Sequence, residues 1–115
     1  MKFLNQKERE QIQKLNEKIR GYDEIVMERV AKDDSQIPLI VVLENRKNHL
    51  LKSLIVLESE IRDIKMNKEL YSDEMLFVKQ TRLDRIKGRI EEVDNTIRFI
   101  LKTLELGRGF SFEQI

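Results

Sequence analysis

The chain has 115 residues, of which 37% are charged, 6% are aromatic, four are glycine and one is proline. This length suits one domain that buries a core without staples, and so few helix breakers among so many charged and aliphatic residues are typical of long helices. The absence of cysteine excludes disulfides and thiolate metal sites. The net charge of +1 is spread evenly along the chain, which argues against nucleic-acid binding because nucleic-acid binders usually carry a basic face.

The hydrophobic runs of the chain are short. The longest unbroken apolar run, Leu39 to Leu43, is far below the length of a membrane span. The N-terminus turns polar at Asn5 before it reaches the length of a signal-peptide core. We therefore expect a soluble, cytoplasmic protein without a membrane span.

The first helix is predicted over about residues 6–32. Asn5 followed by Glu8 is a plausible capping box, in which each residue's side chain accepts a hydrogen bond from the other's backbone N–H. Apolar residues then recur at alternating steps of three and four, which is the spacing of one helix face. These residues are Ile12, Leu15, Ile19, Tyr22 and Val26.

The second helix is predicted over about residues 37–66, after a break at residues 33–38. Ser35 or a preceding aspartate can cap this helix, and Pro38 is tolerated in its first turn. Because the break is short, the second helix should fold back antiparallel to the first. Lys47 fills one position of its seam, and the remaining seam positions are Ile40, Leu43, Leu50, Leu54, Leu57, Ile61 and Ile64.

The third helix is predicted over about residues 73–106, followed by a C-terminal tail over 107–115. Ser72 is a good N-cap, and Gly107 is typical of a helix C-cap. The apolar stripe of this helix is the most regular of the three and consists of Leu83, Ile86, Ile90, Val93, Ile97, Ile100 and Leu104. Three such helices with short connectors predict a single all-α domain, an elongated three-helix antiparallel coiled-coil bundle with up-down-up topology.

The chain lacks the residues that common catalytic and metal sites require. His49 is the only histidine, and one histidine without cysteine cannot build a zinc site, so we expect a surface or interface side chain there. No glycine-rich phosphate loop or nucleophile elbow occurs, and the carboxylates alternate with lysines and arginines as in ordinary surface pairing. We expect a protein that is not an enzyme and that needs no cofactor or metal.

Apolar residues that one seam does not use are candidate partner-binding residues. On the second helix, Val41 and Ile55 fall at heptad position b, and Val42 and Val56 fall at position c, away from the seam. Exposed apolar patches of this kind mark a docking or dimer surface. The alternative is that the second helix is the middle one and needs two apolar faces.

The third helix and the tail carry a second apolar surplus. Phe99 and Leu101 lie off the seam, and the tail adds Phe110, Phe112 and Ile115. These residues are candidates for a partner motif, because bare phenylalanines are costly in water. The alternative is that the tail folds back and covers the end of the bundle.

The segment from Leu15 to Ile64, and within it Leu43-Glu44-Asn45-Arg46-Lys47-Asn48-His49-Leu50-Leu51, resembles the N-terminal helical hairpin of flagellar type III export chaperones of the FlgN and FliT kind. The resemblance covers less than half of the chain, and the third helix and tail do not match. It implies a chaperone in protein transport for the flagellum, which holds a helix of a secretion substrate in an apolar groove. The alternative is a self-associating coiled-coil scaffold component, such as a homodimer within a larger assembly.

Overall fold

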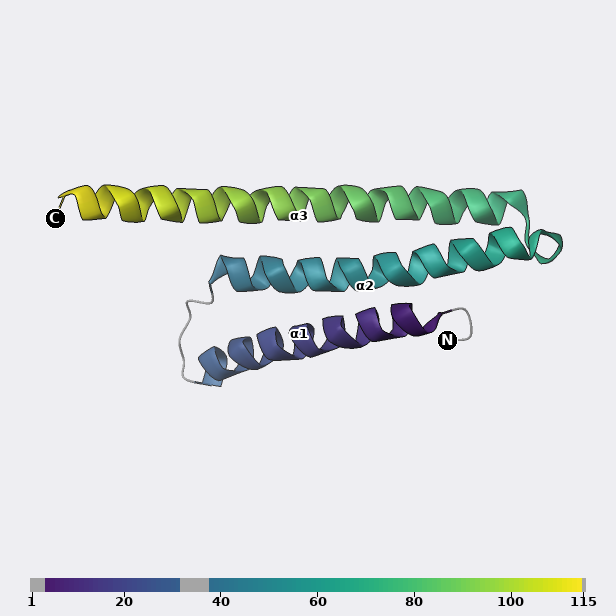
Figure 1. Ribbon diagram of the computed structural model, residues 1–115, viewed down its shortest axis with the longest axis horizontal. Helices are drawn as coiled ribbons and strands as arrows, with labels where there is room; N and C mark the ends of the chain where they lie inside the picture. Colours follow the sequence, from purple (N-terminus) through teal and green to yellow (C-terminus); the bar gives the residue numbers. More distant parts are fainter. Residues whose placement is uncertain (1–3, 32–37, 115) are drawn as a thin grey trace.

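In the computed structural model the chain forms three long antiparallel helices, α1 (Gln6–Ala31), α2 (Leu39–Met66) and α3 (Asp73–Gln114), with a short 3₁₀ helix, η1 (Lys68–Leu70), between α2 and α3 (Figure 1). The structure describes the backbone of residues 4–31 and 38–114 and the side chains of residues 4–29 and 38–103. The molecule measures 68 × 29 × 23 Å along its principal axes. The prediction of an elongated all-α protein with up-down-up topology is confirmed.

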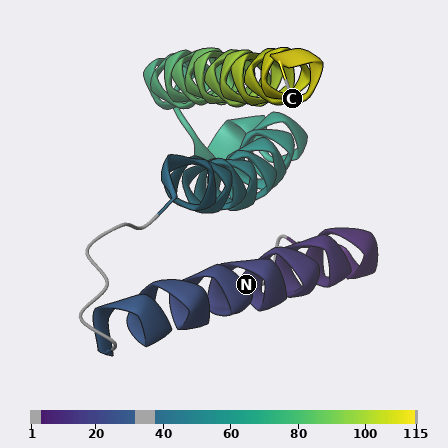
Figure 2. The same ribbon diagram turned by 90° about the vertical axis from the view of Figure 1, so that its left-hand side faces the viewer.

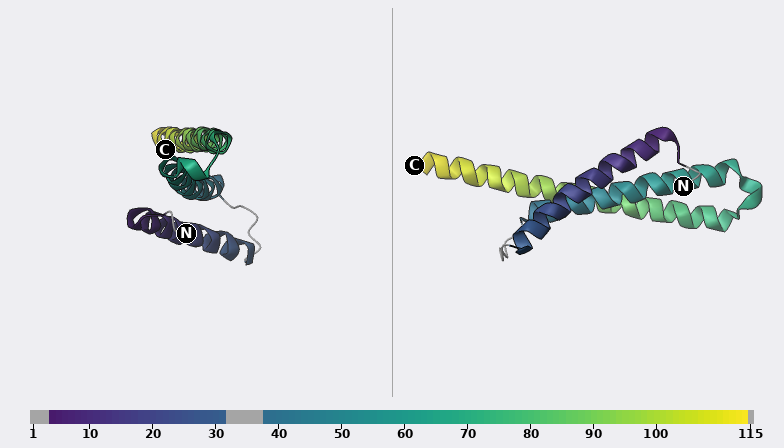
Figure 3. Two further views of the ribbon diagram at one scale, coloured as in Figure 1. Left: turned by 90° about the vertical axis from the view of Figure 1, so that its right-hand side faces the viewer. Right: turned by 90° about the horizontal axis from the view of Figure 1, so that it is seen from below.

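The second helix lies between the other two. α2 packs against α1 on one side and against α3 on the other, while α1 and α3 do not contact each other within the described residues. The end-on views show the three helices stacked in the order α1, α2, α3, and α1 crosses the α2–α3 pair at an angle (Figures 2 and 3). The three helices therefore form an open layer. In a closed triangular bundle α1 and α3 would also contact each other, but here, among the described residues, the two sides of α2 between α1 and α3, which we call its flanks, stay uncovered.

The predicted helix starts are confirmed at two of the three helices. The Asn5 side-chain oxygen accepts a hydrogen bond from the Glu8 backbone N–H at 2.8 Å, and the Glu8 carboxylate accepts one from the Asn5 N–H at 2.9 Å, which completes the capping box. The Ser72 hydroxyl accepts a hydrogen bond from the Met75 N–H at 3.2 Å. α2 begins one residue after Pro38, which occupies the N-cap and offers no side-chain hydrogen bond, while Ser35 and the neighbouring aspartates lie outside the described residues.

The predicted apolar stripes form the core. Every stripe residue whose side chain is described is buried or half-buried, and the most buried ones are Leu15, Ile19, Leu57, Ile61, Ile64, Val93 and Ile97. Lys47, the charged residue in the seam of α2, is compensated across the helix pair, because its ammonium lies 2.7 Å from the Asp94 carboxylate. This hydrogen bond lowers the pKa of Asp94, so the carboxylate stays charged opposite the lysine.

The predicted end of the third helix at about residue 106 is wrong. α3 continues to Gln114, through Gly107 and Gly109, and no separate tail forms over 107–114. Glycine in a helix interior costs only about 1 kcal/mol relative to alanine, so neither glycine alone ends a helix. With 42 residues against the 28 of α2, α3 projects beyond the start of α2 (Figure 1).

We expect replacement of Gly88 by alanine to stabilise the protein. Gly88 lies in the interior of α3, and an added Cβ atom would meet no atom within 4 Å. Alanine reduces the conformational entropy of the unfolded chain, so the free energy of unfolding should rise by roughly 0.5–1 kcal/mol. Chemical denaturation measures this change. An equal or lower stability would show that the backbone at residue 88 is not regular helix.

Candidate functional site

A groove runs between α2 and α3 along one flank of α2, and we call it the α2–α3 groove. It has a volume of about 450 Å³, within the range of binding pockets in proteins, and it is open to solvent along its length. The residues that line it from α2 are His49, Lys52, Ser53, Val56, Leu57 and Glu60, and those from α3 are Lys79, Arg82 and Ile86.

The α2–α3 groove combines an apolar floor with a cationic rim. Val56, Leu57 and Ile86 supply the apolar surface. Lys79 lies 2.6 Å from the Glu60 carboxylate, so this pair neutralises itself. The remaining cations, Lys52 and Arg82, form no ion pair or hydrogen bond within the described part of the chain. The groove can therefore accept an apolar surface whose edges carry negative charge.

A second groove, the α1–α2 groove, lies between α1 and α2 and repeats this pattern. Its volume is about 370 Å³, and its floor consists of Leu15, Leu51 and Ile55. Lys14 and Lys18 line it as well, and no carboxylate is among its lining residues in the part of the chain that the structure describes. The interfaces of α2 with α1 and with α3 thus each carry an apolar groove with a cationic rim.

The structure divides the four candidate residues of the second helix between the two grooves. Ile55 lines the α1–α2 groove and Val56 lines the α2–α3 groove. Val41 is half-buried, while Val42 is 48% exposed. The four residues do not line a single groove, because α2 is the middle helix and adjacent positions on it turn toward different neighbours. That they contact a partner stays a prediction. α2 is the middle helix and packs against a neighbour on each of two sides, as the alternative of two apolar faces expected.

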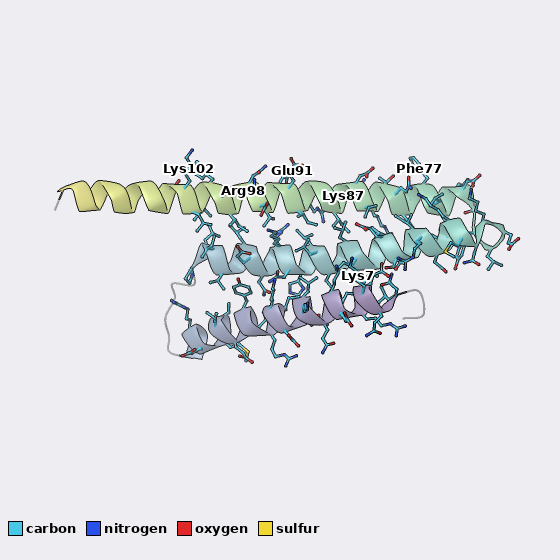
Figure 4. The ribbon with its side chains drawn as sticks, viewed as in Figure 1. Lys7, Phe77, Lys87, Glu91, Arg98 and Lys102 are labelled. Atoms are coloured by element: carbon cyan, nitrogen blue, oxygen red, sulfur yellow. The ribbon has the colours of Figure 1, made fainter. Side chains whose placement is uncertain are left out.

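The candidate residues of the third helix lie outside both grooves. Phe99 and Leu101 are exposed, as is Phe77 near the start of α3. Phe77 projects from the side of α3 that faces away from α2, together with Glu91 and Lys102 (Figure 4). The side chains of Phe110, Phe112 and Ile115 lie outside the described residues. Whether any of these side chains contacts a partner remains a prediction.

Glu8, in the first turn of α1, forms hydrogen bonds and an ion pair with residues of α2. Arg62 donates to both carboxylate oxygens of Glu8 at 2.8 and 3.0 Å, and the hydroxyl of Ser59, a fully buried residue, lies 2.6 Å from Oε2. The Arg62 hydrogen bonds, with those from Ser59 and the Asn5 backbone, lower the pKa of Glu8 from 4.5 to about 2. One carboxylate thus caps α1 and joins it to α2, a second role that helix-capping rules alone do not reveal.

We expect acid to loosen the contact between α1 and α2. The folded-state pKa of Glu8 lies below its unfolded value, so the stabilisation is complete above about pH 5 and is lost as the pH falls from 4.5 toward 2. The loss should be roughly 2–3 kcal/mol, which is the free-energy equivalent of the shift after solvent screening. Unfolding by denaturant at several pH values measures it. A Glu8→Gln variant with the same acid dependence as the parent would contradict the assignment to Glu8.

Two buried polar side chains lie on α2. Asn48 is 6% exposed and its amide Nδ2 has no hydrogen-bond partner in the described structure, and Ser59 is satisfied by Glu8. The neighbouring Asn45 donates to Asp23 of α1 at 2.9 Å. A polar residue within a helix seam can fix the register of the pairing at a cost in stability. The α1–α2 contact is accordingly more polar than a purely hydrophobic hairpin.

The cationic rim of the α2–α3 groove was missed by sequence reasoning, which considered only the even spread of charge along the chain and ordinary surface pairing of its charged residues. The signal is present in each helix separately, because His49, Lys52 and Val56 share the spacing of Lys79, Arg82 and Ile86. His49 is exposed at this rim, as predicted for a surface side chain. Its neighbours supply no metal site, since no cluster of three metal-ligating side chains occurs among the described residues.

Comparison with known proteins assigns the chain to no family. Comparisons of the chain with protein-family models, with curated proteins and with solved structures find no match. Within the described residues, no helix combines the length and apolar content that crossing a membrane requires.

Proposed function

We propose that this protein is a non-enzymatic, cytoplasmic binding protein that holds an amphipathic helix of a partner protein in a groove beside α2. The observation that carries the proposal is the open layer, in which the described residues of α1 and α3 flank α2 without contacting each other. An amphipathic helix laid into such a groove would take the place that a further helix occupies in a closed bundle.

The energetics of the α2–α3 groove support a reversible complex. Val56 and Ile86 are half-buried, so each retains apolar surface that a partner could cover. Covering a large aliphatic side chain completely stabilises by roughly 1.5–3 kcal/mol, and partial covering by proportionately less. The ordering of the partner opposes this gain. Binding should therefore be moderate in affinity, as suits a carrier that must release its partner.

A chaperone for protein export is one form that this function could take. The resemblance of Leu15 to Ile64 to flagellar export chaperones covers part of α1 and most of α2, which is the hairpin that forms the α1–α2 groove. We propose that a secretion substrate is the partner. This proposal rests on the resemblance, whereas the proposal of helix binding rests on the grooves.

The direct test of helix binding uses a designed peptide with a leucine stripe flanked by glutamine. We expect the peptide to shift the methyl NMR signals of Val56, Leu57 and Ile86 or those of Leu15, Leu51 and Ile55. A peptide of the same composition with its leucines scrambled around the helix is the control and should shift neither set. Absence of shifts with the striped peptide, or shifts confined to Leu101, would contradict groove binding.

The second candidate function is self-association as part of a larger assembly. Exposed apolar side chains occur toward the end of α1, in the first turns of α2 and in the C-terminal half of α3, and they are Ile25, Met27, Leu39, Val42, Phe99 and Leu101. Large exposed apolar patches often mark interfaces between proteins. Sedimentation velocity tests this function: dimers that dissociate in the Phe99→Lys, Leu101→Lys variant would favour it, and a monomer at all concentrations would exclude it.

A further inference from the structure

We infer that the helix held in the α2–α3 groove is acidic, with carboxylates on both sides of its apolar stripe. The inference rests on the proposed helix-binding function and specifies the chemistry of the partner. Its basis is the distribution of charge around the apolar floor, which differs from the charge balance of the chain as a whole.

The rim of the α2–α3 groove has a local excess of positive charge. Three cationic side chains line the groove against one carboxylate, Glu60, in a chain whose net charge is only +1. That carboxylate is already engaged by Lys79 at 2.6 Å. Lys52 and Arg82 are left to face the groove with no partner in the described structure. A ligand that supplies carboxylates satisfies both, whereas a ligand with cationic edges is repelled.

The two unpaired cations lie on opposite walls of the groove. Lys52 belongs to α2 and Arg82 belongs to α3, and the apolar floor formed by Val56, Leu57 and Ile86 lies between the two walls. A helix seated on this floor would bring one edge of its stripe to Lys52 and the other edge to Arg82. Carboxylates are therefore needed on both flanks, three or four residues apart along the partner, since those positions border a helical stripe.

The length of the groove fixes the size of the partner segment. The lining residues on α2 extend from His49 to Glu60, which corresponds to about 17 Å at 1.5 Å per residue. Three turns of helix cover this distance. Arg89, exposed and three residues beyond Ile86 on α3, continues the cationic wall by helical spacing and can meet a longer partner.

The groove suits a protein helix better than other anionic ligands. Single-stranded nucleic acids are bound by basic grooves in which bases stack on aromatic side chains, and His49 is the only ring among the lining residues. Anionic membranes bind an outward-facing apolar surface with a basic border, whereas here the apolar floor lies in a concavity between two helices. A peptide helix supplies a narrow apolar stripe and flanking carboxylates together.

The test compares three fluorescent peptides of about 14 residues that share one leucine stripe and differ in the flanking residue, which is glutamate, glutamine or lysine. Fluorescence anisotropy with the full chain should rank affinity in that order, with at least about a tenfold difference between the glutamate and lysine peptides at low salt. Raising the salt from about 50 mM to about 500 mM should bring the three affinities together.

Charge-reversal variants assign the preference to the groove. The variant Lys52→Glu, Arg82→Glu should reverse the ranking. The matched variant Lys87→Glu, Lys102→Glu changes the net charge equally at exposed residues that line neither groove, and it should keep the ranking. Circular dichroism establishes whether both variants remain helical. If the double variant of the groove does not, the single Lys52→Gln variant takes its place, and it should reduce the difference in affinity between the glutamate and lysine peptides.

The failure of the inference and the failure of the proposed function are distinguishable. Equal binding of the three peptides, or a reversal by the control variant as well, would overturn the acidic preference while helix binding stands. Failure of all three peptides to bind would overturn helix binding itself. A single-stranded oligonucleotide or phosphatidylserine vesicles that bind more tightly than the glutamate peptide, and lose binding in the Lys52→Glu, Arg82→Glu variant, would replace the helix with that ligand.

Discussion

Replacement of Ile97 by aspartate is expected to lower the free energy of unfolding by about 3–5 kcal/mol, the usual cost of leaving an unpaired charge buried. Ile97 is 4% exposed and is the most buried apolar side chain of the described core. It belongs to the stripe of α3 that packs against α2, the helix with which α3 makes its interhelical contacts in the described structure. The change also removes apolar burial, which adds to the loss. Thermal or denaturant unfolding followed by circular dichroism measures the effect.

Phe99→Asp is the matched control for this variant. Phe99 lies two residues further along the same helix and is 71% exposed, so the same charge enters water rather than the core. Its effect should stay within about 0.5 kcal/mol, as for most surface substitutions. Equal destabilisation by the two variants would contradict the assigned register of α3 on α2.

Replacement of Glu8 by alanine should lower the free energy of unfolding by about 2–3 kcal/mol at neutral pH. The change removes one half of the capping box, worth about 1 kcal/mol, and the two charge-assisted hydrogen bonds from Arg62. It also removes the hydrogen bond of the Ser59 hydroxyl to α1 and leaves that hydroxyl with the Ile55 carbonyl of its own helix at 2.8 Å. Chemical denaturation gives the total, and amide hydrogen exchange should show that the loss falls mainly on α1.

Glu17→Ala is the corresponding control, because Glu17 is an exposed carboxylate on the same helix. This variant should unfold within about 0.5 kcal/mol of the parent. A Glu8→Ala variant that matched it, with unchanged exchange in α1, would show that the Glu8–Arg62 ion pair contributes nothing in solution.

The number and type of helices could be predicted from the sequence because their signals are local. The alternating steps of three and four define three stripes, and all of their described members are buried or half-buried. The capping box at Asn5 and the N-cap at Ser72 depend on atoms three residues apart, so they too could be predicted. The end of α3 could not, because Gly107 is compatible both with a C-cap and with a helix that continues.

The candidate site depends on contacts between helices, and the spacing of apolar residues within one helix does not show which residues of different helices meet. Val56 and Ile55 are adjacent in the chain, and their division between two grooves follows only from the position of α2 between α1 and α3. The cationic rim combines Lys52 with Arg82 across the α2–α3 pair. Treated one helix at a time, such residues are indistinguishable from ordinary solvated charge.

The most direct test of the open layer is a methyl–methyl NOE measurement on the selectively labelled protein. The structure predicts NOEs from the methyl groups of α2 to those of α1 and to those of α3. It predicts none between Leu15 or Ile19 of α1 and Val93 or Ile97 of α3, because α2 separates the two helices. Strong NOEs between the α1 and α3 methyl groups would instead show a closed three-helix bundle, in which the flanks of α2 are covered and the proposed grooves do not exist.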